Sequence, residues 1–393
     1  MKLRAPFRAT STTAALITIA VAAEAVLITG GVPWTLASNR PAPLPILLAK
    51  VAARPRPRFE AGVVFPQWGV DAYGPLDPNW ALGLGQIRQE TNADWVEMTV
   101  NLRQPTFGSV RIEATPRLTP TPAGVAAGIR LAHRDGFHVF LVPLVTVATV
   151  PHWEGMIPAG TVSHARAWFR AYWRSYGPFV RAAAKASVDQ VAIGTELARM
   201  EHAPPALWDR LLARFRRVYP GPLTYDRNHA SADDPLLPWM HSPLLSTLGI
   251  STWYPVAGQP VAPGARLDAI WHDRVGRHLD RNAKRLGKPV VISEIGYRSS
   301  ADCLSQPYRW RSRAPFDPAC QADAYWAAMH DIASDPHVRG IFVWAWSVPV
   351  FEPNGLPGAR VLREWFSALE GLGAAPTRRG PARTGGHASG SRE

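Results

Sequence analysis

Alternating apolar and amphipathic segments predict an α/β chain that folds into a single (β/α)8 TIM barrel. Eight short apolar segments have the length of strands, and stretches long enough for amphipathic helices separate most of them. Such alternation is typical of βα units in a parallel sheet, and eight units close a barrel. The chain has 393 residues, which accommodates a barrel of about 250 residues or more with extensions.

The predicted strands consist mainly of Val, Ile, Leu and aromatic residues. A parallel strand covered on both faces is apolar along its whole length rather than at alternate positions. The predicted strands are Ala61–Phe65, Trp95–Val100, His138–Leu144, Gln190–Ile193, Leu223–Tyr225, Leu248–Thr252, Pro289–Ile292 and Gly340–Trp344.

Two of the intervening segments predict helices clearly. Thr121–Asp135 precedes the third strand and Ser163–Ala186 precedes the fourth. In the longer segment, large apolar side chains recur at three- and four-residue spacing from Phe169 to Val180. This spacing predicts a stripe that packs on the core rather than a ligand site.

Composition and charge narrow the class of protein. With 47% hydrophobic residues and 16 Trp, the chain can bury a large core, which argues against disorder. The net charge is +13, but residues 1–58 hold eight basic and one acidic side chain, and residues 371–393 hold four basic and one acidic. Only +3 therefore belongs to the middle of the chain, which argues against a nucleic-acid partner.

The first 37 residues predict a signal peptide or a signal anchor. A short basic start precedes the apolar stretch Ala14–Ile28, and Thr35–Ala37 offers a small-residue cleavage site. The alternative is that the stretch is retained and anchors the protein to the membrane. Glu24 would be costly at the centre of a bilayer, which favours removal. In either case we expect export to the periplasm or the exterior.

Three further segments complete the expected organisation. Residues 38–58 are rich in Pro and Arg and predict a spacer, residues 59–370 hold the barrel, and residues 371–393 predict a disordered tail. The two cysteines, Cys303 and Cys320, lie in one loop-like stretch. In an exported protein they favour a disulfide over two free thiols, and they are too few for a soft metal site.

Two glutamates follow buried strands and are the candidate catalytic residues. The run Val290–Ile292 leads to Glu294, and the similar run from Val188 to Thr195 leads to Glu196. Both side chains are expected at the C-terminal mouth of the barrel, where TIM-barrel active sites lie. Cleavage of a glycosidic bond needs one carboxylic acid and one carboxylate about 5–5.5 Å apart in the retaining mechanism. A solvated loop charge is the alternative for either glutamate alone.

Aromatic and polar residues at other strand ends are candidate sugar-binding groups. Flat aromatic rings pack well on the apolar faces of sugars, although core packing is the alternative for any single Trp. Polar strand-end side chains could bind sugar hydroxyls. The aromatic candidates are Trp68, Trp153, Trp253, Tyr254, Trp344 and Trp346, and the polar candidates are Asn101, Gln104 and Asn228. Tyr254 could also donate a hydrogen bond to Glu294.

Four short runs together resemble glycoside hydrolase family 113, the β-mannanase-type family of the retaining clan A barrels. The runs are Gly194–Leu197, Trp253–Pro255, Ser293–Tyr297 and Val343–Trp346, and the resemblance spans residues 60–350. It implies that Glu196 is the acid/base and Glu294 the nucleophile. It further implies that Tyr254 orients Glu294 and that Trp344 or Trp346 forms the floor of the subsite for the cleaved sugar.

One residue departs from the clan A pattern. Most clan A enzymes have Asn before the acid/base, where it contacts the sugar 2-hydroxyl, whereas this chain has Thr195. The contact with that hydroxyl must differ here. The identity of the sugar is therefore left open by the sequence.

Other kinds of site lack their motifs. His152 has no second His at helical spacing, and the chain shows neither a Gly-rich phosphate loop nor a Gly-x-Ser-x-Gly elbow. We expect an exported retaining β-glycosidase that acts internally on mannan or a related polysaccharide, without metal or cofactor. The alternatives are an enzyme that processes the cell's own surface polysaccharide and a non-catalytic carbohydrate-binding barrel. The sequence does not indicate an oligomeric state.

Overall fold

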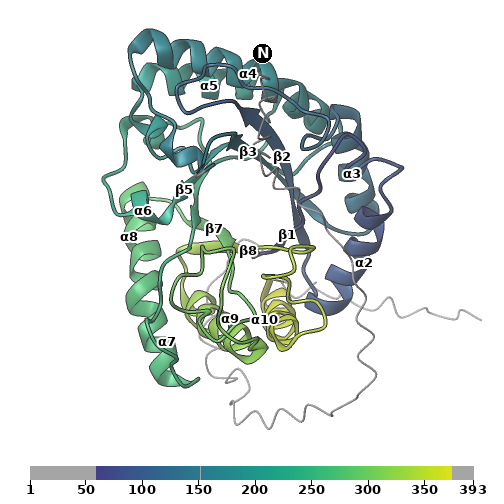
Figure 1. Ribbon diagram of the computed structural model, residues 1–393, viewed down its shortest axis with the longest axis vertical. Helices are drawn as coiled ribbons and strands as arrows, with labels where there is room; N and C mark the ends of the chain where they lie inside the picture. The colour runs from purple at the N-terminus through teal and green to yellow at the C-terminus, as the bar shows by residue number, and fades with distance from the viewer. Residues whose placement is uncertain (1–58, 151, 374–393) are drawn as a thin grey trace, which may run out of the picture. The chain divides into compact units, whose positions relative to one another are not determined.

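A closed barrel of eight parallel strands, paired in sequence order, forms the centre of the molecule (Figure 1). The computed structural model describes residues 59–150 and 152–373. The strands are β1 (Glu60–Val64), β2 (Trp95–Gln104), β3 (His138–Val147), β4 (Gln190–Thr195), β5 (Leu223–Asn228), β6 (Thr247–Ser251), β7 (Val290–Ile295) and β8 (Val338–Val343). Each predicted strand overlaps one of these, so the predicted TIM barrel is confirmed.

The second and third strands are longer than predicted. They pair without interruption from Trp95 opposite His138 to Gln104 opposite Val147. Polar residues at the end of β2 made the apolar run look shorter than the strand. Hydrogen bonding between neighbouring strands sets the length of each, and the two extended strands stabilise each other.

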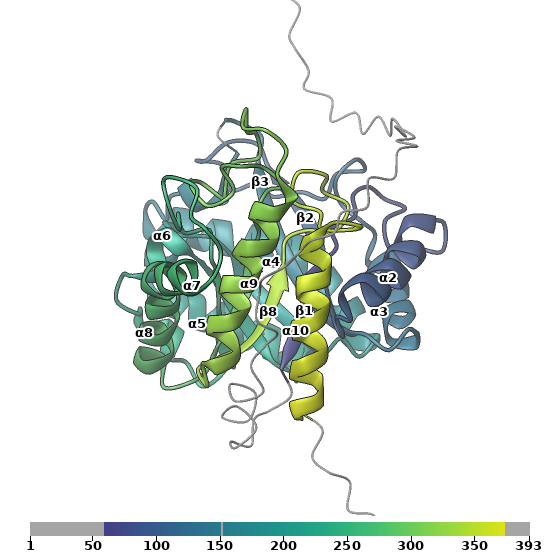
Figure 2. The same ribbon diagram turned by 90° about the horizontal axis from the view of Figure 1, so that it is seen from below.

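Helices surround the barrel on its outer side (Figures 1 and 2). The longer ones are α2 (Pro78–Thr91), α3 (Pro122–Arg134), α4 (Val162–Lys185), α5 (Pro205–Val218), α7 (Ala265–Trp271), α8 (Arg277–Leu286), α9 (Pro318–Ser334) and α10 (Pro357–Gly373). Short turns of helix lie at α6 (His229–Ala232), η1 (Glu154–Met156), η2 (Met200–His202), η3 (Pro238–His241) and the π-type η4 (His272–Gly276).

Local sequence explains where several helices begin. Asp77, Thr121 and Asp317 precede α2, α3 and α9, and each side chain accepts hydrogen bonds from backbone N–H groups of the first turn. A proline follows each of these residues at the first helical position, where the missing N–H costs nothing. These caps fix the points at which the chain turns back along the barrel.

The predicted stripe on α4 packs on the core. Phe169, Tyr176 and Val180 are buried, and Trp173 is partly buried against Phe215. The helix therefore uses its aromatic face for packing, as the three- and four-residue spacing predicts.

Apolar side chains pack inside the barrel, and the strand C-termini are where TIM-barrel active sites lie. Val64, Phe140, Val291 and Phe342 belong to one interior cluster. Gly62 allows this packing, because a Cβ there would lie 2.3 Å from Cδ1 of Phe342.

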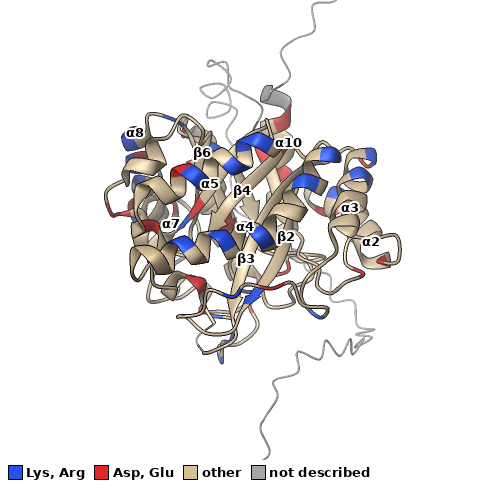
Figure 3. Ribbon diagram, turned by 90° about the horizontal axis from the view of Figure 1, so that it is seen from above, with Lys and Arg blue, Asp and Glu red and all other residues tan. Residues whose placement is uncertain are grey.

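The positions of the charged residues are relevant to whether the chain has a nucleic-acid or membrane partner. Lys and Arg lie mainly on the outer helices, α4 and α5 among them (Figure 3). Within residues 59–150 and 152–373, no helix is both long and apolar enough to cross a membrane. The expected signal or anchor segment (1–37), the spacer (38–58) and most of the tail (371–393) lie outside the described residues.

Candidate active site

Glu196 lies directly after β4 with its backbone in the left-handed region, at φ 49°. Its backbone N–H donates to the carbonyl oxygen of Asp226 on β5 at 2.9 Å. The register between the two strands shifts just before this point. Such a backbone conformation is uncommon for a residue other than Gly and is found preferentially at functional sites.

Each carboxylate oxygen of Glu196 accepts one hydrogen bond from a side chain. The indole Nε1 of Trp153 donates to Oε2 at 2.6 Å, and Nδ2 of Asn228 donates to Oε1 at 2.7 Å. The other end of the Asn228 amide accepts from the backbone N–H of Ala230 at 2.8 Å, which fixes its orientation. The structure therefore places Trp153 and Asn228, both expected to contact sugar, against the carboxylate of Glu196.

Glu294 lies in β7 and accepts a hydrogen bond at Oε2 from Nε1 of Trp253, at 3.0 Å. The expected hydrogen bond from Tyr254 is wrong: among residues 59–150 and 152–373 its hydroxyl has no hydrogen-bond partner, and its ring stacks on His278 at 4.6 Å. Successive residues of an extended segment point to opposite sides. Trp253 thus joins the interior cluster, while Tyr254 packs with the core outside the barrel.

A third carboxyl group, that of Asp226 on β5, lies buried at the site. Ser251 donates to its Oδ2 at 3.0 Å, and Ser293 donates to its Oδ1. Asp226 was not among the expected site residues, although it directly follows the predicted strand Leu223–Tyr225. The signal was the same as for Glu196, an acidic residue after a short apolar run.

Burial and mutual repulsion keep the carboxyl groups of the site from ionising together. Burial raises the pKa of Glu196. Burial, and then the charges of Glu196 and Asp226, raise the pKa of Glu294 well above its usual value. Burial and the charge of Glu196 raise the pKa of Asp226 to about 8. Close acidic groups titrate as a set and share protons, so the site can hold an acid and a carboxylate side by side.

A comparison with protein families shows to which family the chain belongs. The model of Glycoside Hydrolase Family 113 matches residues 82–357, which include both Glu196 and Glu294. The chain belongs to glycoside hydrolase family 113. It is therefore a glycoside hydrolase, and the resemblance expected from the four short runs is confirmed.

Solved family 113 structures share the fold. The β-mannanase of Alicyclobacillus acidocaldarius in complex with ManMIm is 23% identical with a TM-score of 0.66, over 79% of this chain and 98% of that one. A complex of a family 113 β-1,4-mannanase is 21% identical with a TM-score of 0.66, over 79% and 99% of the two chains. A family 5 mannosidase from Rhizomucor miehei is 12% identical with a TM-score of 0.54, over 81% and 94%. A comparison with curated proteins gave no match.

In this family 113 barrel the other aromatic candidates occupy different places. Trp344 belongs to the interior cluster, and its ring meets that of Trp253 edge to face at 6.5 Å. Trp346 is buried in the outer core. Of the two residues expected to form the floor of the subsite, Trp344 is therefore the one that contacts Trp253, the hydrogen-bond donor to Glu294. Trp68 follows β1 and is 44% exposed. The indole N–H of Trp344 has no hydrogen-bond partner in the part of the chain that the structure describes and can donate to a ligand.

The polar residues of the family 113 chain that were expected to bind sugar also lie in different environments. Gln104 is wrong as a sugar-binding residue: it is fully buried, its Oε1 accepts from Trp168 at 2.8 Å, and its Nε2 donates to the carbonyl of Thr106 at 2.9 Å. It faces α4 rather than the mouth. Asn101 is nearly buried and accepts from Thr146 at 2.8 Å. The hydroxyl of Thr195 is buried, and no described residue forms a hydrogen bond with it.

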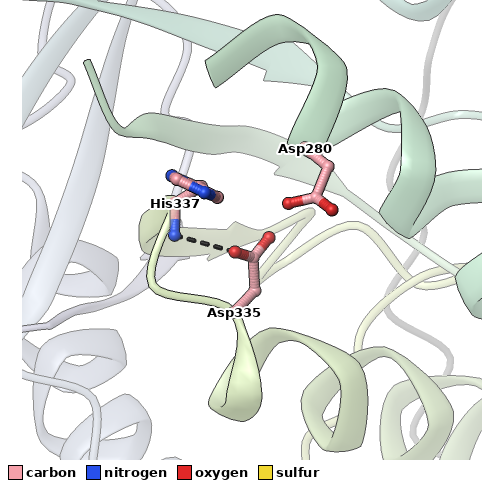
Figure 4. A group of neighbouring side chains, drawn as sticks. All are labelled: Asp280, Asp335 and His337. Carbon is pink, nitrogen blue, oxygen red and sulfur yellow. Dashed lines mark hydrogen bonds between the residues drawn. The ribbon is translucent and has the colours of Figure 1, made fainter. Parts of the chain in front are cut away.

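A group that could hold a metal ion lies outside this site. Ligand atoms of Asp280 in α8, Asp335 and His337 lie within 4.8 Å of one another (Figure 4). The backbone N–H of His337 donates to Asp335 at 2.7 Å, and Lys284 lies 3.6 Å from Asp280. Asp335 and His337 precede β8 at the end of the barrel opposite the mouth. The two carboxylates therefore serve a backbone turn and an ion pair, away from Glu196 and Glu294.

Proposed function

We propose that this family 113 chain is a retaining endo-β-1,4-mannanase, with Glu196 as acid/base and Glu294 as nucleophile. The observation that supports the proposal is the pairing of the two glutamates at the barrel mouth, one after β4 and one in β7, each with its own hydrogen-bond donors. Two interacting carboxyl groups with different hydrogen-bond partners are what double displacement requires.

In the first step Glu196 holds the proton that the two carboxyl groups share and donates it to the leaving glycosidic oxygen. The Glu294 carboxylate attacks the anomeric carbon, the bond to the leaving sugar breaks, and a glycosyl ester forms on Glu294. The N–H of Trp253 holds the attacking carboxylate in place.

In the second step Glu196 acts as the base. Esterified Glu294 carries no charge, so its repulsion of the Glu196 carboxylate is lost and the ionised form of Glu196 becomes easier to hold. Glu196 takes a proton from water, the hydroxide attacks the anomeric carbon, and the ester bond to Glu294 breaks. Trp153 and Asn228 donate to the ionised carboxylate, and both carboxyl groups return to their starting states.

Mannan is the substrate that the relatives favour. Two solved relatives are named as family 113 β-mannanases. Thr195 stands before Glu196, and its unpartnered hydroxyl is suited to accept or donate one hydrogen bond to a sugar hydroxyl. We place the enzyme outside the cytoplasm, on the signal pattern of residues 1–37.

The test is hydrolysis of mannans, glucans, xylans and aryl β-glycosides by the purified chain, with Glu196→Gln and Glu294→Gln beside it. Mannooligosaccharides that both substitutions abolish, released first as the β-anomer in proton NMR spectra, are the expected result. Release of the α-anomer first would overturn the retaining mechanism. Activity confined to another glycan would keep the two glutamates and replace the substrate.

A further inference from the structure

We propose that Tyr308 and Trp310 form an additional carbohydrate subsite that binds sugar units of a polymeric β-linked substrate beyond the unit being cleaved. Both lie on the β7–α9 loop, residues 296–317, which joins the nucleophile strand to α9. The inference rests on the proposed function and extends it from the cleaved bond to the length of the chain that is bound.

The exposure of the two rings is the first observation. Trp310 is 55% exposed and Tyr308 is 44% exposed, whereas Trp253 and Trp344 are buried. A large aromatic ring held in water leaves apolar area uncovered, and neighbouring exposed rings are typical of binding surfaces. In Figure 2 the loop leads into the end of α9 at the mouth of the barrel.

Continuity with the catalytic residues is the second observation. The ring of Trp310 meets Trp344 edge to face at 6.1 Å, Trp344 meets Trp253 at 6.5 Å, and Trp253 donates to Glu294. An unbroken series of indole rings thus leads from the nucleophile to Trp310 on the exposed rim. A sugar chain that enters over Glu294 meets these rings in turn.

Tyr308 contacts the segment that follows β5. Its ring stacks on His229 at 6.1 Å with an interplanar angle of 19°. His229 directly follows Asn228, which donates to Glu196. Tyr308 thus lies against the segment after β5, and Trp310 lies against Trp344, which follows β8, so the loop contacts two different strand ends.

The backbone of the loop is held rigidly. The disulfide Cys303–Cys320 ties the loop to α9. The buried guanidinium of Arg298 donates to the carbonyl oxygens of Gln306 at 2.6 Å and Arg309 at 2.8 Å. These two carbonyls flank Tyr308. A surface that is ordered before binding loses little conformational entropy when the ligand arrives, which suits a stacking subsite.

The chain supplies a matched control on the same loop. Phe316 is 70% exposed, more than either proposed residue, and in the described part of the chain its ring makes no contact with another ring. Phe316→Ala therefore removes an exposed aromatic ring from the loop without touching the proposed series. We compare it with Trp310→Ala and Tyr308→Ala.

Binding is measured in the full chain carrying Glu294→Gln, so that turnover does not interfere. Calorimetric titration with mannobiose and mannohexaose is expected to show that Trp310→Ala weakens binding of the hexaose about tenfold, Tyr308→Ala less, and Phe316→Ala not at all. A tenfold change is about 1.4 kcal/mol. Mannobiose affinity should be equal in all four proteins, because the disaccharide does not reach the rim.

The subsite proposal would be overturned if Trp310→Ala bound mannohexaose as tightly as its parent. It would also be overturned if Phe316→Ala lost as much hexaose affinity as Trp310→Ala. Failure of the proposed mannanase function would give a different result. If wild-type protein hydrolyses glucan or xylan oligomers instead of mannan, the same titration with those oligomers decides the subsite. If mannan is hydrolysed and Trp310 makes no difference, the function stands and the subsite falls.

Discussion

Two side chains hold the carboxylate of Glu196 and affect its pKa. Trp153 and Asn228 donate one hydrogen bond each to its carboxylate. Burial raises the pKa of Glu196, and these two donors, with Ser251, lower it. Hydrogen-bond donors stabilise the ionised carboxylate, so they limit the rise in the pKa of Glu196 and keep that pKa near the operating pH. In the proposed mechanism both residues therefore position the acid/base.

Trp153→Phe tests this role. Removing the indole N–H takes away a donor that lowers the pKa of Glu196, so that pKa should rise. In the pH dependence of kcat/KM on an aryl β-glycoside, the alkaline limb reports loss of the Glu196 proton, and we expect it to move up by about one pH unit. We expect kcat to fall about tenfold, since the acid is less well oriented.

The control for this prediction is Trp168→Phe, which also loses an indole hydrogen bond, the one to Gln104. Trp168 lies on α4, outside the barrel. Its substitution should lower stability and leave the alkaline limb in place. An alkaline limb that moves equally in both variants, or in neither, would contradict the role of Trp153.

At the scale of elements, strand ends and the loops after them are arranged by different means. Register shifts between β4 and β5 and between β6 and β7 lie beside Glu196 and Glu294. Extra residues in a ladder redirect side chains, and such irregularities are frequent beside active sites. The β7–α9 loop is instead fixed by a covalent bond and by Arg298.

The disulfide should stabilise the loop and, through it, the binding of long substrates. Cys303→Ser with Cys320→Ser opens a closed segment with a sequence separation of 17, which by loop entropy costs about 3 kcal/mol. We expect a lower Tm in calorimetry. We also expect turnover of polymer to fall more than turnover of an aryl glycoside, which does not reach the rim. Equal losses on the two substrates would separate the disulfide from the subsite.

Packing inside the barrel is tested at Gly62. A Cβ there would lie 2.3 Å from the Phe342 ring, so Gly62→Ala should lower the free energy of unfolding by about 1–3 kcal/mol in urea titrations. Gly85 in α2 has no atom within 4 Å of an added Cβ. Gly85→Ala should raise stability by about 0.5–1 kcal/mol, because alanine favours a helix. Similar losses in both variants would contradict the packing argument.

At the scale of the whole molecule, the acidic barrel mouth is expected to make stability depend on pH. Burial and the charge of Glu196 raise the pKa of Asp226 from 3.8 to about 8. The folded protein thus retains a proton that the unfolded chain releases above pH 4. Stability from this group is complete below about pH 4 and is lost as pH rises toward 8. The loss is at most about 1.4 kcal/mol per pH unit.

Asp226→Asn removes this dependence while keeping the shape of the side chain. Ser251 and Ser293 can reorient their hydroxyls toward the amide. The free energy of unfolding, measured in urea from pH 4 to pH 8, should fall less steeply with pH in the variant than in wild type. The two proteins should differ most near pH 8, with the variant the more stable. Parallel curves would show that Asp226 ionises normally.

The amino-acid sequence by itself determined the barrel, the family and the places of Glu196 and Glu294 at strand ends. Periodic apolar runs and the residues that follow them are local signals, and hydrophobic burial acts on them in the same way in every βα unit. Glu196 and Glu294 were found because each follows such a run.

Only the tertiary structure decided which groups touch these glutamates. Trp253 rather than Tyr254 donates to Glu294, because a register shift and the alternation of an extended segment choose which neighbour points inward. Trp153, Asn228 and Asp226 come from different strands and loops, and Gln104 turned outward to α4. Contacts between segments far apart in sequence depend on how the barrel closes, and no local pattern in the chain specifies them.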